Sequence, residues 1–310
     1  MIKIVSENRL KCLVLLVLLT FCLTGCVELL TDSQIREIKK FSAASNTYSE
    51  YPGTVMKAHA DLSLYNQLTN ASSAVDGENA FGLIEKGIEK QKRLIALGER
   101  ADNACKILRS YSGILDKLSS DIYTSETQAS VEKFGSQLDR SIKEYNQITK
   151  SSITLFGGTV AAIVKGTASI YIRNKQHAAI KTAVQEADPV IEEITNSIIT
   201  FLETYAGPNS LEILQAERDD LQTWYEMAGY KQPLSTSIWV SEKLKIIESI
   251  LMFVDKSKKA AISLREAHTV LMTKIDKKMD LRDTIEIIET LVDEVEAAKD
   301  LKNKIEKQSI

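Results

Sequence analysis

The spacing of apolar residues between Ile180 and Tyr205 restricts the fold of this chain more than any other feature of its sequence. Eight apolar residues of this segment are separated by intervals that alternate between four and three positions, namely Ile180, Val184, Ala187, Ile191, Ile194, Ile198, Phe201 and Tyr205. This alternation places all eight side chains on one face of an α-helix and does not fit the two-residue period of a β-strand. Pro189 lies inside the segment, and an internal proline removes one helical hydrogen bond. We therefore expect a long helix here that is kinked or divided near Asp188.

The same helical spacing recurs along most of the chain. Long segments with this spacing cover residues 81–118, 134–145, 240–275 and 281–305, and shorter helices are expected over 32–50, 54–71 and 209–228. Glycine, proline and short polar stretches separate these segments, and no segment has the residue alternation of a strand. The sequence thus predicts an all-α fold, an elongated multi-helix bundle with long, coiled-coil-like helices.

The composition of the chain is that of a folded protein, and its net charge limits the kinds of partner that it can bind. Hydrophobic residues make up 44% and charged residues 26% of the 310 positions, which is not the composition of a disordered chain. Only 4 prolines and 13 glycines are present, and this argues against a collagen-like, low-complexity or turn-rich β-sandwich chain. The formal net charge of −3 argues against nucleic acid as a partner, because binding it requires a basic face.

The first 26 residues are organised as a secretory signal peptide. Three basic residues precede an apolar run of 12 residues from Cys12 to Leu23, and the small residues Thr24 and Gly25 separate this run from Cys26. Twelve apolar residues are too few to span a bilayer comfortably as a permanent helix. We therefore expect residues 1–25 to direct export and then to be removed.

The junction Leu23-Thr24-Gly25-Cys26 resembles the lipobox of bacterial lipoprotein precursors, and the resemblance covers only this N-terminal segment. It implies that a diacylglycerol is attached to Cys26 through a thioether, that cleavage follows Gly25, and that an acyl chain is usually added to the new amino group. These covalent chains are the only non-protein groups that we expect, with no other cofactor and no metal.

The acyl chains implied by this resemblance determine where the mature protein resides. Each buried CH₂ group contributes about 0.8 kcal/mol, so two or three chains hold a protein firmly on a bilayer. Val27 follows Cys26, whereas an aspartate at this place often retains bacterial lipoproteins in the inner membrane. The resemblance therefore implies a lipid-anchored protein of the bacterial cell envelope, displayed on the periplasmic or the outer side, and it favours the outer membrane.

The mature chain is expected to contain one large domain. Residues 26–33 carry the lipidated cysteine and a short tether, and residues 34–310 form a single helical-bundle domain with a candidate subdivision at residues 207–209. Thr31 and Gln34 match a capping box, which predicts that the first helix begins directly after Thr31.

Residues 153–172 are apolar on all sides, unlike the helices around them. In one interpretation they form a central helix or short hairpin buried in the bundle, where small residues allow close approach. In the other they insert into a membrane, because about 20 residues match a spanning helix and Gly157-Gly158 could turn a hairpin. Lys165 opposes insertion, since a lysine at mid-span costs about 2.5–3.5 kcal/mol. The candidate membrane residues are Ile153, Leu155, Phe156, Val160, Ile163, Val164, Ile170 and Ile172.

Few residues of the chain are candidates for catalysis or metal binding. The three histidines, His59, His177 and His268, have no metal-binding spacing, and no phosphate-binding or dinucleotide motif occurs. His268 lies on an apolar helical stripe and is expected in the core, whereas His177 is expected in a solvated polar turn. Because Cys26 would be lipidated, Cys105 is the only free thiol expected in the mature chain, so no intramolecular disulfide is available. We expect no catalytic residues and no enzymatic activity.

Both tryptophans of the chain lie near a predicted loop over residues 229–236. With two neighbouring tyrosines they form the candidate partner surface Trp224, Tyr225, Tyr230 and Trp239. Aromatic side chains supply large contact area and are frequent in binding hot spots. The alternative is that these residues pack the corner between two helices.

The expected function is that of a non-catalytic scaffold or protein-interaction component of the envelope. Such a protein would be attached to the lipid bilayer through Cys26 and would bind a protein partner. An alternative follows from the long helices around an apolar segment, which resemble the helical pore-forming toxins of the haemolysin E and haemolysin BL type. That resemblance implies a membrane-active protein that inserts residues 153–172.

Overall fold

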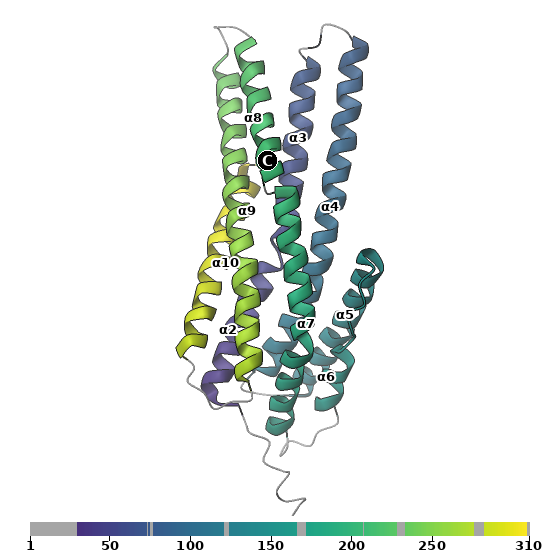
Figure 1. The fold of residues 1–310 in the computed structure, drawn as a ribbon, viewed down its shortest axis with the longest axis vertical. Coiled ribbons are helices and arrows are strands. Elements are labelled where there is room, and N and C mark those ends of the chain that lie inside the picture. The colour runs from purple at the N-terminus through teal and green to yellow at the C-terminus, as the bar shows by residue number, and fades with distance from the viewer. Residues whose placement is uncertain are drawn as a thin grey trace, which may run out of the picture. The chain divides into compact units, whose positions relative to one another are not determined.

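Within the part of the chain that the structure describes, every regular element is an α-helix. This computed structural model describes residues 30–72, 74, 77–120, 124–165, 172–206, 208–227, 233–275 and 282–308. The helices of these residues are α2 (Asp32–Tyr48), α3 (Pro52–Ser72), α4 (Gly77–Leu118), α5 (Ser125–Thr149), α6 (Gly157–Val164), α7 (Ile172–Ala206), α8 (Pro208–Met227), α9 (Leu234–Lys274) and α10 (Arg282–Gln308). They pack as an all-α multi-helix bundle (Figure 1), which confirms the fold class predicted from the sequence.

The first described helix begins where its capping box predicts. The backbone N–H of Gln34 donates to the Thr31 hydroxyl at 3.2 Å, and the N–H of Thr31 donates to the Gln34 side-chain oxygen at 2.8 Å. Two N–H groups at the helix start thereby gain partners that the helix itself does not supply. The predicted break after residue 118 is also confirmed, because α4 ends at Leu118 and α5 begins at Ser125.

Helices α3 and α4 pack antiparallel through two positions that interrupt the apolar stripe of α4. The side-chain N–H of Gln91 donates to a carboxylate oxygen of Asp61 at 3.0 Å. A Cβ atom at Gly98 would lie 3.1 Å from the Cβ of Met56, so the glycine lets the two helices approach closely. Later residues of α4 therefore contact earlier residues of α3, which shows that the two helices run in opposite directions.

The C-terminal half of α4 lies in the core of the bundle. Helix α4 contacts α2, α5 and α7 as well as α3, and the side chains of Leu108, Tyr111 and Leu115 are fully buried. Aromatic packing extends the core toward α9, where the rings of Tyr51 and Phe253 meet edge-on with centroids 6.2 Å apart. Each such buried side chain contributes on the order of 1.5–3 kcal/mol to the stability of the fold. Contacts between helices far apart in the sequence therefore stabilise the core.

Of the two outcomes expected at Pro189, a kink or a division of the helix, the division does not occur. Helix α7 runs without interruption from Ile172 to Ala206, and Pro189 lies inside it. The residues on both sides of the proline bury the same face, since Val184, Ile191 and Ile194 are fully or almost fully buried, while Pro189 is exposed. Burial of this continuous face outweighs the roughly 3 kcal/mol that an internal proline costs a helix.

The two ends of the bundle are formed by different helix termini. At one end α2 begins beside the end of α9, where the Gln34 amide donates to the Lys274 carbonyl at 3.5 Å. Helix α9 starts at Leu234 and has 41 residues, which corresponds to a length of about 60 Å. At the other end, the top of Figure 1, α3 finishes near the start of α4 and α8 finishes near the start of α9. We call this the distal end.

Candidate functional site

Three of the four aromatic residues predicted as a partner surface meet at the distal end. The rings of Trp224 on α8 and Trp239 on α9 are edge-on, with centroids 5.8 Å apart. The hydroxyl groups of Tyr225 and Ser237 share a hydrogen bond of 2.7 Å. Tyr230 lies outside the described residues. The aromatic contacts fasten α8 to α9, and Trp224, Tyr225 and Trp239 nevertheless remain half-exposed.

A lysine and a tyrosine that were not predicted complete this aromatic cluster. The Nζ atom of Lys243 lies 4.2 Å from the ring centroid of Tyr65 on α3 and 6.0 Å from that of Trp239. An ammonium group over an aromatic ring is attracted by the ring quadrupole, by about 0.5–2 kcal/mol. Burial lowers the pKa of Lys243, although the neighbouring carboxylates oppose this shift. The contact joins α3 to α9, and no local sequence pattern relates two residues so far apart in the chain.

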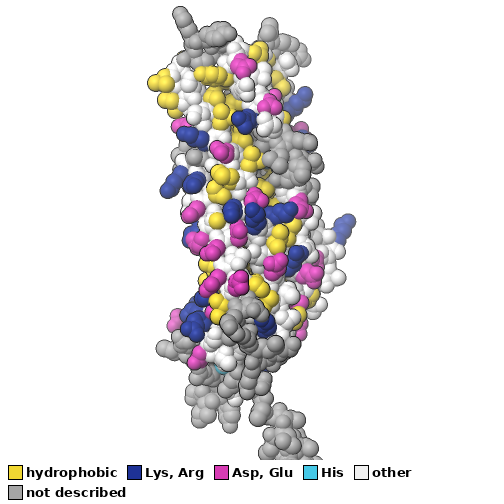
Figure 2. Space-filling view, turned by 60° about the vertical axis from the view of Figure 1, so that its left-hand side comes forward, with side chains coloured by type: hydrophobic (Ala, Val, Ile, Leu, Met, Phe, Trp, Pro, Cys, Tyr) yellow, Lys and Arg dark blue, Asp and Glu magenta, His cyan; other side chains and the backbone are white. Residues whose placement is uncertain are grey.

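Large apolar side chains are exposed around the same end. We call the following residues the distal patch: Leu68 on α3, Phe81 on α4, Met227 on α8, and Leu234 and Ile238 on α9. Met227 and Leu234 have the highest exposures of this group, 74% and 76%. Figure 2 shows hydrophobic side chains at the upper left edge and over the upper middle of one face. Exposed apolar surface of this kind is a candidate interaction site.

The sequence around the distal end is also depleted in charge. Of the 44 residues in segments 62–84 and 221–241, four are charged: Asp76, Glu78, Glu226 and Lys231. The fraction for the whole chain is 26%. Depletion of charged residues together with Trp, Tyr, Phe and Met side chains that are partly or fully exposed is a composition that binding surfaces share.

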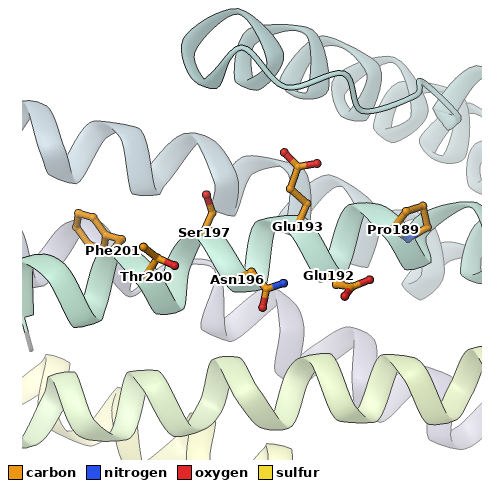
Figure 3. Close-up of a pocket in the computed structure, with 7 residues that line it drawn as sticks. All are labelled: Pro189, Glu192, Glu193, Asn196, Ser197, Thr200 and Phe201. Carbon is orange, nitrogen blue, oxygen red and sulfur yellow. The ribbon is translucent and has the colours of Figure 1, made fainter.

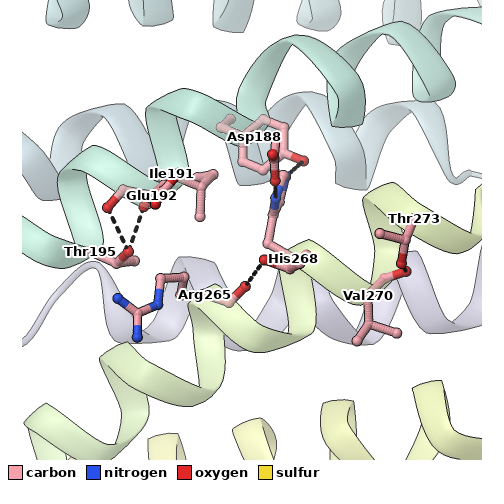
Figure 4. A network of polar contacts seen from close by, with 10 residues as sticks. Asp188, Ile191, Glu192, Thr195, Arg265, His268, Val270 and Thr273 are labelled. Atoms are coloured by element: carbon pink, nitrogen blue, oxygen red, sulfur yellow. Dashed lines mark hydrogen bonds and ion pairs between the residues drawn. The ribbon is translucent and has the colours of Figure 1, made fainter.

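A buried polar network joins three helices in the core. The Tyr111 hydroxyl on α4 lies 3.0 Å from Nε2 of His268 on α9. Nδ1 of His268 lies 3.2 Å from a carboxylate oxygen of Asp188 on α7, and Figure 4 shows these two side chains facing one another. Tyr111 and His268 are almost completely buried. A neutral histidine with its proton on Nδ1 satisfies both contacts, because it accepts from Tyr111 and donates to Asp188. His268 is therefore a core histidine, as its position on the apolar stripe predicts.

This network makes the stability of the bundle depend on pH. Burial lowers the pKa of His268 from its ordinary value near 6.5, although the hydrogen bond with Asp188 opposes the shift. Below about pH 6.5 the unfolded chain binds a proton on this histidine that the folded chain excludes. We expect the free energy of unfolding to decrease as the pH falls from 7 toward 5, by at most about 1.4 kcal/mol per pH unit from this group.

Denaturant unfolding of the wild type and of His268→Gln at a series of pH values measures this effect. The variant should be less stable at pH 7, because Tyr111 and Asp188 lose a partner, and its pH profile should be shallower. The other two histidines are present in both proteins, so the difference between the profiles reports on His268 together with its hydrogen-bond partner Asp188, whose pKa the contact with His268 lowers. Parallel profiles would show that His268 does not carry the pH dependence.

The prediction that His177 lies in a solvated turn is wrong. His177 is part of α7 and is 4% exposed. The helix begins at Ile172, before the first residue of the apolar stripe at Ile180. Position 177 precedes that residue by three positions and therefore faces the same side of the helix. Helical spacing was the signal that could have predicted the burial of this histidine.

A polar groove runs along one face of α7. Its lining residues are Pro189, Glu192, Glu193, Asn196, Ser197, Thr200 and Phe201 (Figure 3). The side chains of Glu192 and Glu193 project in different directions, so the two carboxylates do not form an acid–base pair. The Ser197 hydroxyl accepts a hydrogen bond of 2.8 Å from Tyr145 on α5.

The apolar segment 153–172 does not form a helix of spanning length. Helix α6 has eight residues, Gly157–Val164, and α7 begins at Ile172. Gly157 and Gly158 were predicted as a possible hairpin turn, but they are the first two residues of α6. Phe156, Val160 and Val164 are buried, Ile153 and Ile163 are half-buried, and Leu155 is exposed, whereas Ile170 lies outside the described residues. No helix in the described ranges combines the length and the apolar character needed to cross a membrane.

Helix α6 is held directly against the backbone of α5. The carboxylate of Asp139 on α5 accepts hydrogen bonds from the backbone N–H of Gly157 at 2.7 Å and of Gly158 at 2.9 Å. These bonds satisfy N–H groups at the start of α6 that have no helical partner. A Cβ atom at Gly135 would lie 2.6 Å from the carbonyl oxygen of Gly157, so the two backbones touch where both residues are glycine.

The predicted lipidation site cannot be compared with the structure, because Gly25 and Cys26 lie outside the described residues. Among the described residues, no group of three or more histidine, cysteine, aspartate or glutamate side chains is placed to hold a metal ion. Comparisons with protein-family models, with curated proteins and with solved structures give no match to this chain. Its function is therefore inferred from its own residues.

Proposed function

We propose that the protein is a lipid-anchored, non-catalytic scaffold of the bacterial cell envelope that holds an envelope component at its distal end. The distal patch is the observation that carries this proposal. It gathers five exposed apolar side chains beside a half-exposed aromatic cluster, in a region with few charges. Such surface is costly to leave in water, so it is best explained by a bound component.

The separation of the two ends supports the role of a scaffold. The lipobox resemblance attaches acyl chains to Cys26, which precedes the start of α2 by a few residues in the sequence. Helix α9 extends about 60 Å from Lys274, beside the start of α2, to Leu234 at the distal end. A component bound by the distal patch is thus held at a distance that the helices determine.

We do not propose the alternative in which residues 153–172 insert into a membrane. Phe156, Val160 and Val164 already contribute to the core, and Phe156 packs edge-on against Tyr111 with ring centroids 6.4 Å apart. Insertion would require these buried contacts to be broken and Lys165 to enter the bilayer.

Site-specific photocrosslinking in cells tests the proposed function. A photoreactive amino acid is placed at Ile238 in the distal patch or at Met252 on the same helix. The two positions are 50% and 45% exposed and are separated by about 21 Å along α9. We expect an adduct, with a protein or with lipid, at position 238 and no such adduct at position 252.

Equal labelling at the two positions, or no adduct at either, would contradict a component held at the distal end. A catalytic activity of the purified protein that disappears on substitution of one residue would contradict the non-catalytic part of the proposal.

A further inference from the structure

The exposed apolar side chains at the distal end belong to several helices and not to one. The distal patch draws its residues from four helices, α3, α4, α8 and α9. In Figure 2 hydrophobic side chains appear both at the edge and over the middle of the upper part of the bundle. A protein partner covers one side of a surface, whereas an apolar medium contacts an immersed end on all sides. The distribution favours immersion in such a medium.

The residues of α9 change in character with distance from the distal end. Leu234 is the first residue of the helix, Ile238 follows one turn later, and Trp239 comes next. Lys243 lies about 14 Å along the helix from Leu234. The boundary of a lipid bilayer has the same order, with acyl chains innermost, then the level at which tryptophan and tyrosine gather, then headgroups that accept amines.

We propose that the distal end binds the surface of a lipid bilayer. Phe81, Met227 and Leu234 enter the boundary between headgroups and acyl chains, and Trp224 and Trp239 lie at headgroup level. Interfacial elements enter this boundary by about 5–10 Å, which corresponds to the helical turns from Leu234 to Trp239. This inference rests on the proposed function, because it names the component that the distal end holds.

The scarcity of charge at the distal end also determines which lipids are required. Segments 62–84 and 221–241 contain one basic residue, Lys231, and three acidic ones. Attraction to anionic headgroups needs a cluster of basic residues, which these segments lack. Binding therefore depends on apolar contact, occurs on uncharged phosphatidylcholine, and changes little between low and high salt.

The two tryptophans allow a direct experiment, because both tryptophans of the chain lie at the distal end. The purified lipidated protein is incorporated into donor vesicles of phosphatidylcholine. Acceptor vesicles contain phosphatidylcholine brominated near the headgroup end of its acyl chains, which quenches tryptophan within the bilayer boundary. We expect quenching and a blue shift of tryptophan emission when the acceptor vesicles are added, with little change in 0.5 M salt. In a second experiment the donor vesicles contain the brominated lipid instead. Quenching of tryptophan emission in these vesicles shows that the distal end contacts the bilayer that carries the anchor.

A pair of variants shows whether the distal patch is responsible. Met227→Ser combined with Leu234→Ser removes two exposed side chains and leaves the core unchanged, so the fold is expected to persist. We expect this variant to bind acceptor vesicles at least about tenfold more weakly. Met252→Ser is the matched control, because it removes an exposed apolar residue of α9 far from the distal end and should bind as the wild type does.

Several outcomes would overturn the inference. One is a protein incorporated into donor vesicles whose tryptophan emission is unchanged by bromine in either vesicle. Another is equal binding by the double variant and by Met252→Ser. A third is an emission shift that requires a protein extract and not lipid, which would assign the distal patch to a protein partner. Failure of the protein to enter donor vesicles would instead count against the lipid anchor, and it is scored separately by vesicle flotation.

Discussion

Replacement of Gly157 by valine is expected to destabilise the bundle by about 3 kcal/mol or more. A Cβ atom at this position would fall on the carbonyl oxygen of Gly135, which belongs to the backbone of α5. A side chain can move to another rotamer, but a helical backbone cannot, so α6 must separate from α5. Separation also breaks the two hydrogen bonds that Asp139 accepts from the start of α6. Overpacking of this kind commonly costs 1–3 kcal/mol, and the loss of buried contacts by Phe156 and Val160 adds to it.

Urea unfolding followed by far-ultraviolet circular dichroism measures this effect. Gly82→Ala is the matched control, because Gly82 lies inside α4 and a Cβ atom there would meet no atom within 4 Å. Alanine at that position is expected to stabilise the protein by about 0.5–1 kcal/mol, through the higher helix propensity of alanine. If Gly157→Val were as stable as the wild type, the contact between α5 and α6 would not have the geometry described above.

Replacement of Cys26 by serine is expected to remove acylation completely. A serine oxygen does not form the thioether that the lipobox resemblance implies, so no diacylglycerol is attached. Two or three acyl chains give firm membrane attachment at about 0.8 kcal/mol per buried CH₂ group, and their loss is therefore the largest change in membrane affinity that one substitution can make here. Intact-mass measurement of the membrane-bound protein should find a wild-type chain that begins at Cys26 and carries acyl mass.

Cys105→Ser is the control for this substitution. Cys105 is buried in α4, and burial raises the pKa of its thiol, so it is not a reactive thiolate. This variant should retain the full acyl mass. A wild-type protein without acyl chains, found in the soluble fraction, would remove the anchor from the proposed function and would leave the distal patch as the remaining indication of membrane contact.

The presence of the long helices could be predicted from the sequence, because each helix buries one face and the 3.6-residue period shows it. Their ends were predicted less well, since α5 covers Ser125–Thr149 whereas the apolar spacing marked residues 134–145, and α7 begins at Ile172, before the stripe that starts at Ile180. The break after Leu118 and the capping box at Thr31 were predicted for the same reason, since both depend on neighbouring residues. A division at Pro189, one of the two outcomes expected there, does not occur, because the cost of a proline is local, whereas the burial that outweighs it comes from other helices.

The candidate site could be predicted only in part. Trp224, Tyr225 and Trp239 lie close together in the sequence, and they also meet in the structure. The contact of Lys243 with Tyr65 could not be predicted, because periodicity shows which face is buried and not which helix covers it. The distal patch was missed for the same reason, since its residues become one surface only when four helices end together.

The continuous helices α4 and α9 have a mechanical consequence. Each has more than 40 residues and takes part both in the core and at the distal end. A pulling force between Thr31 and the distal end would act along these axes, so neighbouring helices would have to slide past one another in shear. Interlocked side chains resist sliding together, whereas they give way one after another when helices are peeled apart. The arrangement of the helices therefore favours resistance of the bundle to extension along its length.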